Sequence, residues 1–228
     1  MLLEKLISVV AASATLLGGS MDAALPDKDI DGTLFLINRQ NAVSELYVPP
    51  VREVVANGMN QSMRDDAATA LEEMFEAAKE DGVRLSVVSG YRSYSKQATI
   101  YQRKVATTGS EEKADELVAR AGTSEHQLGL AMDVSKNGSS SLTERFAETE
   151  EGQWVYQNAH RFGFIVRYLE GYEEITGYSY EPWHVRYVGR EHAAAIYASQ
   201  EPMETYMTDY KLQVYDFLIH QDTNEVLP

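Results

Sequence analysis

The sequence predicts an α+β fold in a single domain, with helices packed around a small sheet. The chain has 228 residues, which is enough for one well-packed core and leaves little for a second. Hydrophobic residues make up 44% and charged residues 24%, which is an ordinary globular composition. Segments with helical periodicity alternate with short β-rich runs, and no internal repeat interrupts this order.

The first residues, 1–24, have the pattern of a signal peptide or of a short N-terminal anchor. A short charged start is followed by an apolar stretch over residues 6–17 and then by small residues. This stretch is shorter than the ~20 residues of a membrane-spanning helix, so no stable span is expected beyond such an anchor. We therefore expect an exported, extracytoplasmic protein.

Residues 25–60 are expected to form an N-terminal strand and an extended segment. The polar, turn-rich residues 22–32 resemble a linker. The run TLFLIN at 33–38 is typical of a short strand, and residues 42–51 contain Pro49-Pro50, which favours extended chain.

Residues 61–200 are expected to form the main folded domain, and residues 201–228 a C-terminal extension. Apolar residues recur at helical spacing from residue 62 onward, with Gly82 just after the last of them. Further helices are expected at 94–107, 111–121, 143–161 and 190–199, and strands at 83–89, 130–134, 164–168 and 183–188. The extension is expected to add a helix at 206–219 that packs on the domain.

Charge and cysteine content exclude several classes of function. The formal net charge of −15 argues against binding to a nucleic-acid backbone, which requires a basic surface. The chain has no cysteine, so it has no disulfide, no thiolate nucleophile and no cysteine-ligated zinc. Any metal must therefore be held by histidine, aspartate or glutamate.

The first cluster of candidate residues is the segment SEHQLGLAMD, residues 124–133. His126 and Asp133 are seven residues apart, which corresponds to ~23 Å in an extended strand. The two side chains can meet only if the chain folds back between them, and Gly129 provides a place for that bend. Ala131 shares a strand face with Asp133 and is small enough to leave room for a metal and its water.

The second cluster is Glu181-Pro182-Trp183-His184. Pro182 fixes its own φ angle and biases Glu181 towards an extended conformation. The proline therefore provides a rigid mount for a carboxylate near a potential ligand histidine.

Zinc chemistry accounts for these residue types occurring together. Catalytic zinc takes three protein ligands and a water, and His126, Asp133 and His184 provide two imidazoles and a carboxylate. The metal lowers the pKa of its water to about 7. Glu181 is then a spare carboxylate that can act as the general base. The same ligand types also serve other divalent ions.

The third cluster is SGYRS at residues 89–93, with Gln97 five residues after Arg92. It directly follows an expected strand, where functional loops are common. The guanidinium of Arg92 has a forked geometry that suits a carboxylate, so Arg92 is a candidate for binding an acidic group.

The segments SGYRS…Q, SEHQLGLAMD, NAHRFGFIVRY and EPWHVRYVG resemble, in order and spacing, the VanY-type D-alanyl-D-alanine carboxypeptidases of the LAS metallopeptidase group. The resemblance runs from about Leu34 to about Tyr197. It implies the LAS/hedgehog-like zinc peptidase fold, with a mainly antiparallel sheet, and a Zn²⁺ cofactor. Residues 169–172 depart from the family's usual pattern.

The resemblance also implies a role for each candidate residue. His126, Asp133 and His184 match the zinc ligands, and Glu181 matches the general base. A further set matches positions that contact the substrate: Arg92, Gln97 and Ser124 at its terminal carboxylate, and Tyr91 and Trp183 along the pocket. The implied reaction removes a C-terminal D-amino acid, usually D-alanine, from peptidoglycan stem peptides.

Other functions are compatible with the same residues. An L,D-carboxypeptidase, a D,D-dipeptidase or a peptidoglycan endopeptidase would have the same metal site. A wall-binding or zinc-storing module, or a regulatory domain, would not need Glu181 beside the ligands. The remaining histidines, His160, His192 and His220, are expected to be structural. The sequence gives no indication of the oligomeric state.

Overall fold

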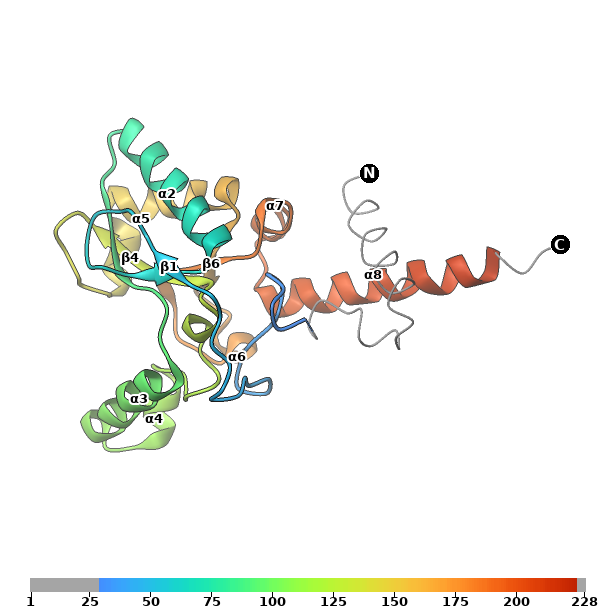
Figure 1. Ribbon diagram of the computed structural model, residues 1–228, viewed down its shortest axis with the longest axis horizontal. Helices are drawn as coiled ribbons and strands as arrows, with labels where there is room; N and C mark the ends of the chain where they lie inside the picture. Colours follow the sequence, from blue (N-terminus) through green and yellow to red (C-terminus); the bar gives the residue numbers. More distant parts are fainter. Residues whose placement is uncertain (1–28, 225–228) are drawn as a thin grey trace. The chain divides into compact units, whose positions relative to one another are not determined.

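The computed structural model describes residues 29–224 and is built on a four-stranded antiparallel sheet (Figure 1). The strands follow the order β3-β4-β6-β5. Their bounds are Leu85–Ser89 for β3, Ala131–Lys136 for β4, Phe164–Tyr168 for β5 and Glu181–Tyr187 for β6. The expected α+β class and the small antiparallel sheet are therefore confirmed. The predicted signal peptide, residues 1–24, lies outside the described residues.

The two faces of this sheet differ in character. Asp133 of β4 pairs with His184 of β6, and Met132 of β4 pairs with Val185 of β6. Because side chains alternate along a strand, Asp133 and His184 share one face, while Met132 and Val185 point to the opposite one. Met132 and Val185 are fully buried in the core. The strand register therefore places candidate ligands side by side on a polar face.

Helices lie on both sides of the sheet. The helix α2 (Asp65–Glu80) contacts β3, and α5 (Glu150–Asn158) contacts β4, β5 and β6. On the opposite side, α3 (Tyr94–Thr108) and α4 (Glu111–Asp115) pack against each other (Figure 1). The apolar face of α2 is buried, as its periodicity predicts, through Ala67, Leu71, Met74 and Ala78.

One expected strand is wrong. Residues 33–38 form turns and irregular chain, and they join neither sheet. Leu34, Phe35 and Ile37 are buried, so the apolar pattern of this run reflects packing and not strand pairing. A short hairpin that was not expected follows it, made of β1 (Arg52–Glu53) and β2 (Ser62–Met63).

Two expected helices have different bounds. The segment 143–161 is divided into η3 (Glu144–Glu148), α5 and η4 (Ala159–Phe162). Thr149 causes the first break, because its extended backbone and its hydroxyl, which accepts a hydrogen bond from the Gly152 N–H, begin a new helix. The second helix, α4, ends at Asp115 instead of residue 121.

Residues 37–202 form one compact unit that contains the sheet and every candidate site residue. Within it lie the short helix α6 (Glu173–Thr176) and α7 (Arg190–Ser199), which contacts β5. Residues 29–36 belong to a second unit with α8 (Met203–Asn224), the helix expected in the C-terminal extension. Over residues 29–224, none of the helices has both the length and the apolar character that crossing a membrane requires.

Candidate metal centre and active site

His126, Asp133 and His184 come together on the polar face of the sheet. One ligand atom from each residue lies within 4.8 Å of the others, and all three residues are buried. Asp133 and His184 are direct partners in the β4–β6 pair, whereas His126 comes from η2 (Glu125–Leu128). Gly129 ends η2 with a φ of 69°, which folds the chain back before β4. The bend expected at Gly129 is therefore present.

Neighbouring groups orient each histidine ring. His126 Nδ1 lies 2.8 Å from the carbonyl oxygen of Gly90, which can only accept, so Nδ1 carries the proton and Nε2 has the free lone pair. His184 Nε2 lies 3.2 Å from Glu125 Oε2, while His184 Nδ1 lies 3.1 Å from Asp133 Oδ1. His126 Nε2 and His184 Nδ1 thus both face Asp133.

This donor set fits a zinc ion. Two imidazole nitrogens and a carboxylate oxygen are the ligand types of catalytic zinc. His126 Nδ1 faces a carbonyl oxygen and His184 Nε2 faces a carboxylate, so the second nitrogen of each ring is the one directed towards Asp133. The guanidinium of Arg92 contacts His126 Nε2 at 2.6 Å and Asp133 Oδ2 at 2.9 Å. His126 Nε2 and Asp133 Oδ2 thus accept from Arg92 in this structure, and the guanidinium would have to turn away from them for these two atoms to hold an ion.

The two histidines differ in proton affinity. Burial, together with the positive charge of Arg92, lowers the pKa of His126 to about 4. Burial also lowers the pKa of His184, but hydrogen bonds to Asp133 and Glu125 outweigh this and raise the pKa to about 9. Burial lowers the pKa of both rings, so the difference between them comes from the charged groups beside each ring.

Glu181 lies beside the cluster and outside the set of three ligands. It is the first residue of β6, and its Oε2 atom lies 3.7 Å from His184 Nδ1. Burial raises the pKa of Glu181 to about 7, and the negative charge of Asp133 adds to the effect against the opposing charge of His184. A carboxylate with such a pKa is suited to accept and return a proton near neutral pH.

Arg92 and Gln97 form a connected pair at the edge of the cluster. Arg92 Nη1 donates to Gln97 Oε1 at 2.9 Å, and Arg92 Nε donates to Ser89 Oγ at 2.9 Å. The Gln97 amide donates in turn to the carbonyl oxygen of Ala119 at 2.7 Å. Gln97 therefore holds the guanidinium of Arg92 in place from a buried position.

The candidate residues line a hollow of about 390 Å³ between the sheet and α3. Ser124 and Trp183 are on its wall, together with Arg92, Gln97, the three candidate ligands and Glu181. Tyr91 is not among the residues that line it, and its backbone N–H donates to the Ser62 carbonyl. Two of the remaining histidines lie elsewhere, since His160 stacks on Tyr197 and His192 is buried in α7.

The sequence reasoning missed a buried charged network centred on Glu125. Glu125 Oε1 accepts hydrogen bonds from Arg167 at 2.7 Å and from Arg186 at 2.8 Å, and Oε2 faces His184. Burial raises the pKa of Glu125, but the two arginine charges outweigh it and hold the pKa well below its usual range. A signal was present in the sequence, because arginines within apolar strands such as FIVRY need a buried acid.

A family model for VanY, D-alanyl-D-alanine carboxypeptidase, matches residues 60–190, which is more than half of the chain. The chain belongs to the VanY family. It is 43% identical over 189 residues to the putative carboxypeptidase YodJ of Bacillus subtilis strain 168, covering 79% of this chain and 69% of YodJ.

Solved structures of related enzymes have the same fold. The LdcB LD-carboxypeptidase aligns with a TM-score of 0.74 and 41% identity, covering 79% of this VanY-family chain and 88% of LdcB. A mutant of the vancomycin resistance D,D-pentapeptidase VanY, in complex with Zn(II), aligns with a TM-score of 0.68 and 39% identity, covering 77% and 98% of the two chains. The sheet and helices described above are therefore those of a zinc peptidase family.

Proposed function

We propose that this VanY-family protein is a zinc-dependent carboxypeptidase that removes a C-terminal D-amino acid, D-alanine, from peptidoglycan stem peptides. The observation that carries the proposal is the buried group of His126, Asp133 and His184 with the free carboxylate of Glu181 beside it. The family match and the zinc-bound relative support it. A module that only bound zinc or cell wall would not require Glu181 at this position.

His126, Asp133 and His184 would hold the zinc ion through Nε2, one carboxylate oxygen and Nδ1, respectively. The bound ion would supply Lewis-acid polarisation and a water of lowered pKa. Glu181 accepts the proton of the attacking water and then delivers it to the nitrogen of the departing D-amino acid. Its pKa of about 7 suits both steps.

Arg92 is the proposed partner of the substrate's terminal carboxylate. Its guanidinium lies within hydrogen-bond distance of two of the ligands, so a group bound by Arg92 is close to the reaction centre. Gln97 fixes the direction of Arg92, and Ser124 lines the same hollow. Trp183, next to His184 in β6, lines the path of the peptide.

Glu125 is the proposed positioning residue of the metal centre. It accepts the Nε2 proton of His184 and thereby presents Nδ1 to Asp133 and Glu181. Arg167 and Arg186 keep Glu125 ionised and fix its orientation. Glu125 therefore sets the orientation of the His184 ring without itself being a metal ligand.

A second candidate function is cleavage of the bond between an L- and a D-residue. The similarity to the LdcB LD-carboxypeptidase favours it, because LdcB aligns with a TM-score of 0.74. Cleavage of the D-alanyl-D-alanine dipeptide, or of a bond within a cross-linked peptide, would use the same residues. Stem peptides of the cell wall lie outside the cell membrane, in agreement with the export expected from residues 1–24.

The products of defined peptides test the proposal. The zinc-loaded protein is incubated with stem pentapeptide, stem tetrapeptide and the free dipeptide, and the products are identified by mass. Loss of one alanine from the pentapeptide supports the D,D-carboxypeptidase. Loss of one alanine from the tetrapeptide alone supports the L,D alternative, and the absence of any cleavage contradicts both.

A further inference from the structure

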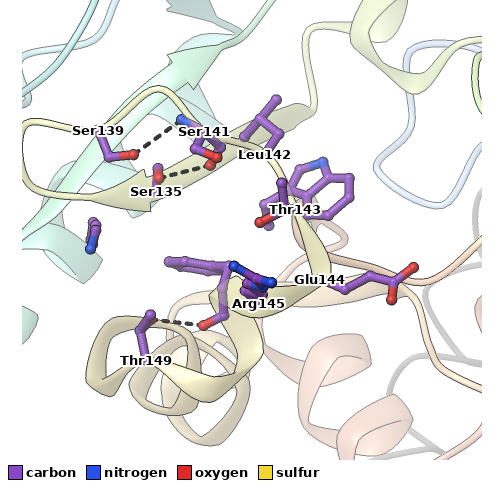
Figure 2. Close-up of a pocket in the computed structure, with 11 residues that line it drawn as sticks. Ser135, Ser139, Ser141, Leu142, Thr143, Glu144, Arg145 and Thr149 are labelled. Atoms are coloured by element: carbon purple, nitrogen blue, oxygen red, sulfur yellow. Dashed lines mark hydrogen bonds between the residues drawn. The ribbon is translucent and has the colours of Figure 1, made fainter.

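A second groove adjoins the active-site hollow and has a volume of about 720 Å³ (Figure 2). Its wall includes Ser135 at the end of β4, the loop at 137–143, which we call the serine loop, and the start of η3. Ser135 is two residues after Asp133 and so lies on the same face of the sheet. The polar face that carries the candidate ligands therefore continues into this groove.

Two residues connect the groove with the active-site hollow. Leu142 and Trp183 line both, and Trp183 is directly followed by the candidate ligand His184. Arg92 and Gln97 line the hollow but not the groove. A peptide with its free C-terminus at Arg92 can therefore extend past Trp183 into the groove.

The wall of the groove is held by hydrogen bonds within the protein. Ser135 Oγ donates to the carbonyl oxygen of Ser141 at 3.1 Å, and the Ser141 N–H donates to Ser139 Oγ at 3.1 Å (Figure 2). The Gly138 N–H donates to Ser86 Oγ at 3.3 Å, which ties the serine loop to β3. The groove is thus formed before any ligand enters, which lowers the entropic cost of binding.

Arg145 and Lys136 line the groove and bring positive charge to it, in a protein whose net charge is −15. Its nitrogen atoms lie in the space between the serine loop and Thr149, whereas the carboxylate of Glu144 extends away from that space (Figure 2). Within residues 29–224, Arg145 makes no ion pair, although most other arginines of the protein pair with an acid. Arg145 is therefore available to an acidic ligand.

We propose that this groove binds the part of the substrate that precedes the cleaved bond, and that Arg145 pairs with a carboxylate there. The proposal rests on the proposed carboxypeptidase function. An extended peptide covers ~7 Å in two residues, which is also the length from Asp133 to Ser135 along β4. A carboxylate two residues before the cleaved bond therefore comes within reach of the groove. The ligand class is an acidic peptide, with Trp183 packing against its chain.

The test compares three substrates on the zinc-loaded protein: a stem pentapeptide with a free side carboxylate, the same peptide with that group as an amide, and acetyl-D-alanyl-D-alanine. Arg145→Gln is expected to raise KM about tenfold for the acidic peptide and to leave kcat unchanged. The amidated peptide and the short substrate should be unaffected. Arg145→Lys should restore part of the affinity, and Arg161→Gln, which removes an arginine hydrogen-bonded to Asn158, serves as the matched control.

An equal rise of KM on all three substrates in the Arg145→Gln protein, or an unchanged KM for the acidic peptide, overturns the groove assignment. If the wild-type protein cleaves none of them, the proposed function fails. Binding of the acidic peptide by the groove is then tested separately by calorimetry. The peptide is titrated into the Glu181→Gln protein and into the same protein with Arg145→Gln. Tighter binding of the acidic peptide only when Arg145 is present supports the groove, and equal binding contradicts it.

Discussion

His184 Nε2 lies 3.2 Å from Glu125 Oε2, and the Glu125 side chain has no exposed surface. The carboxylate thus connects a candidate metal ligand with two buried arginines, Arg167 and Arg186. The metal centre and the charged core of the sheet are therefore one hydrogen-bonded unit, and a change in Glu125 should affect metal binding and stability together.

Glu125→Gln is expected to lower the free energy of unfolding by about 3–5 kcal/mol, because it leaves two buried arginines without a compensating charge. Zinc affinity should fall by about 10–100-fold, because His184 loses its ionised acceptor. Denaturant unfolding and zinc competition titration measure the two effects. Glu112→Gln, at an exposed position of α4, is the control. Unchanged zinc affinity would contradict the positioning role.

Glu181→Gln tests the general base. The variant should keep its zinc, because Glu181 is outside the group of three ligands, and its turnover should fall by about 10²–10⁴-fold. Metal content and steady-state rates are measured on the same preparation. Turnover at the wild-type rate would show that another group moves the proton.

The pH dependence of kcat/KM follows from the same residue. Glu181 must be deprotonated to accept a proton, so the rate should fall as the pH drops through its pKa. Burial raises this pKa to about 7, and a bound cation stabilises the carboxylate, so the midpoint of the acid limb should lie at or below pH 7. The profile is measured at saturating zinc. A midpoint above pH 7 would contradict this description of the Glu181 environment.

Arg92→Ala tests the carboxylate partner. The variant should lose about 100-fold in kcat/KM on peptides with a free C-terminus, since a charged hydrogen-bond partner is removed. Peptides with an amidated C-terminus, which we expect to be poor substrates of the wild type, should change far less. Zinc content is measured alongside, because Arg92 contacts His126 and Asp133. Equal losses of kcat/KM on both peptide types would argue against Arg92 as the partner of the substrate's terminal carboxylate.

Most of the sheet and the order of its elements could be predicted from the sequence. The runs at 83–89 and 164–168 are β-rich and bounded by turn residues, which are local signals. The run at 33–38 has the same local pattern, but whether a strand has a partner depends on distant parts of the chain. Likewise, the helical periodicity of 143–161 did not reveal the break at Thr149, which depends on a capping hydrogen bond.

The residue types of the candidate site could be predicted from the sequence, but the hydrogen bonds that link them could be predicted less well. The motif around His126 and the one around His184 could be recognised, and the bend at Gly129 was expected from the spacing. The sequence indicates that an arginine such as Arg167 needs a buried acid, but it does not identify Glu125 as that acid. Arg167 and Arg186 are 42 and 61 residues away from Glu125 in the sequence and meet it only in the folded sheet. The contact between Gln97 and Arg92 also needs the folded structure, since a sequence does not show which polar groups are already paired.

Metal analysis with removal and rescue tests the central claim most directly. The purified protein should contain one zinc ion per chain, lose both zinc and peptidase activity with a chelator, and recover both when zinc is added. His184→Ala should prevent zinc retention, while His160→Ala, at a residue that stacks on Tyr197 away from the cluster, should not. Full activity after the metal is removed, or full zinc occupancy in the His184→Ala protein, would contradict the assignment of His126, Asp133 and His184 as the metal centre.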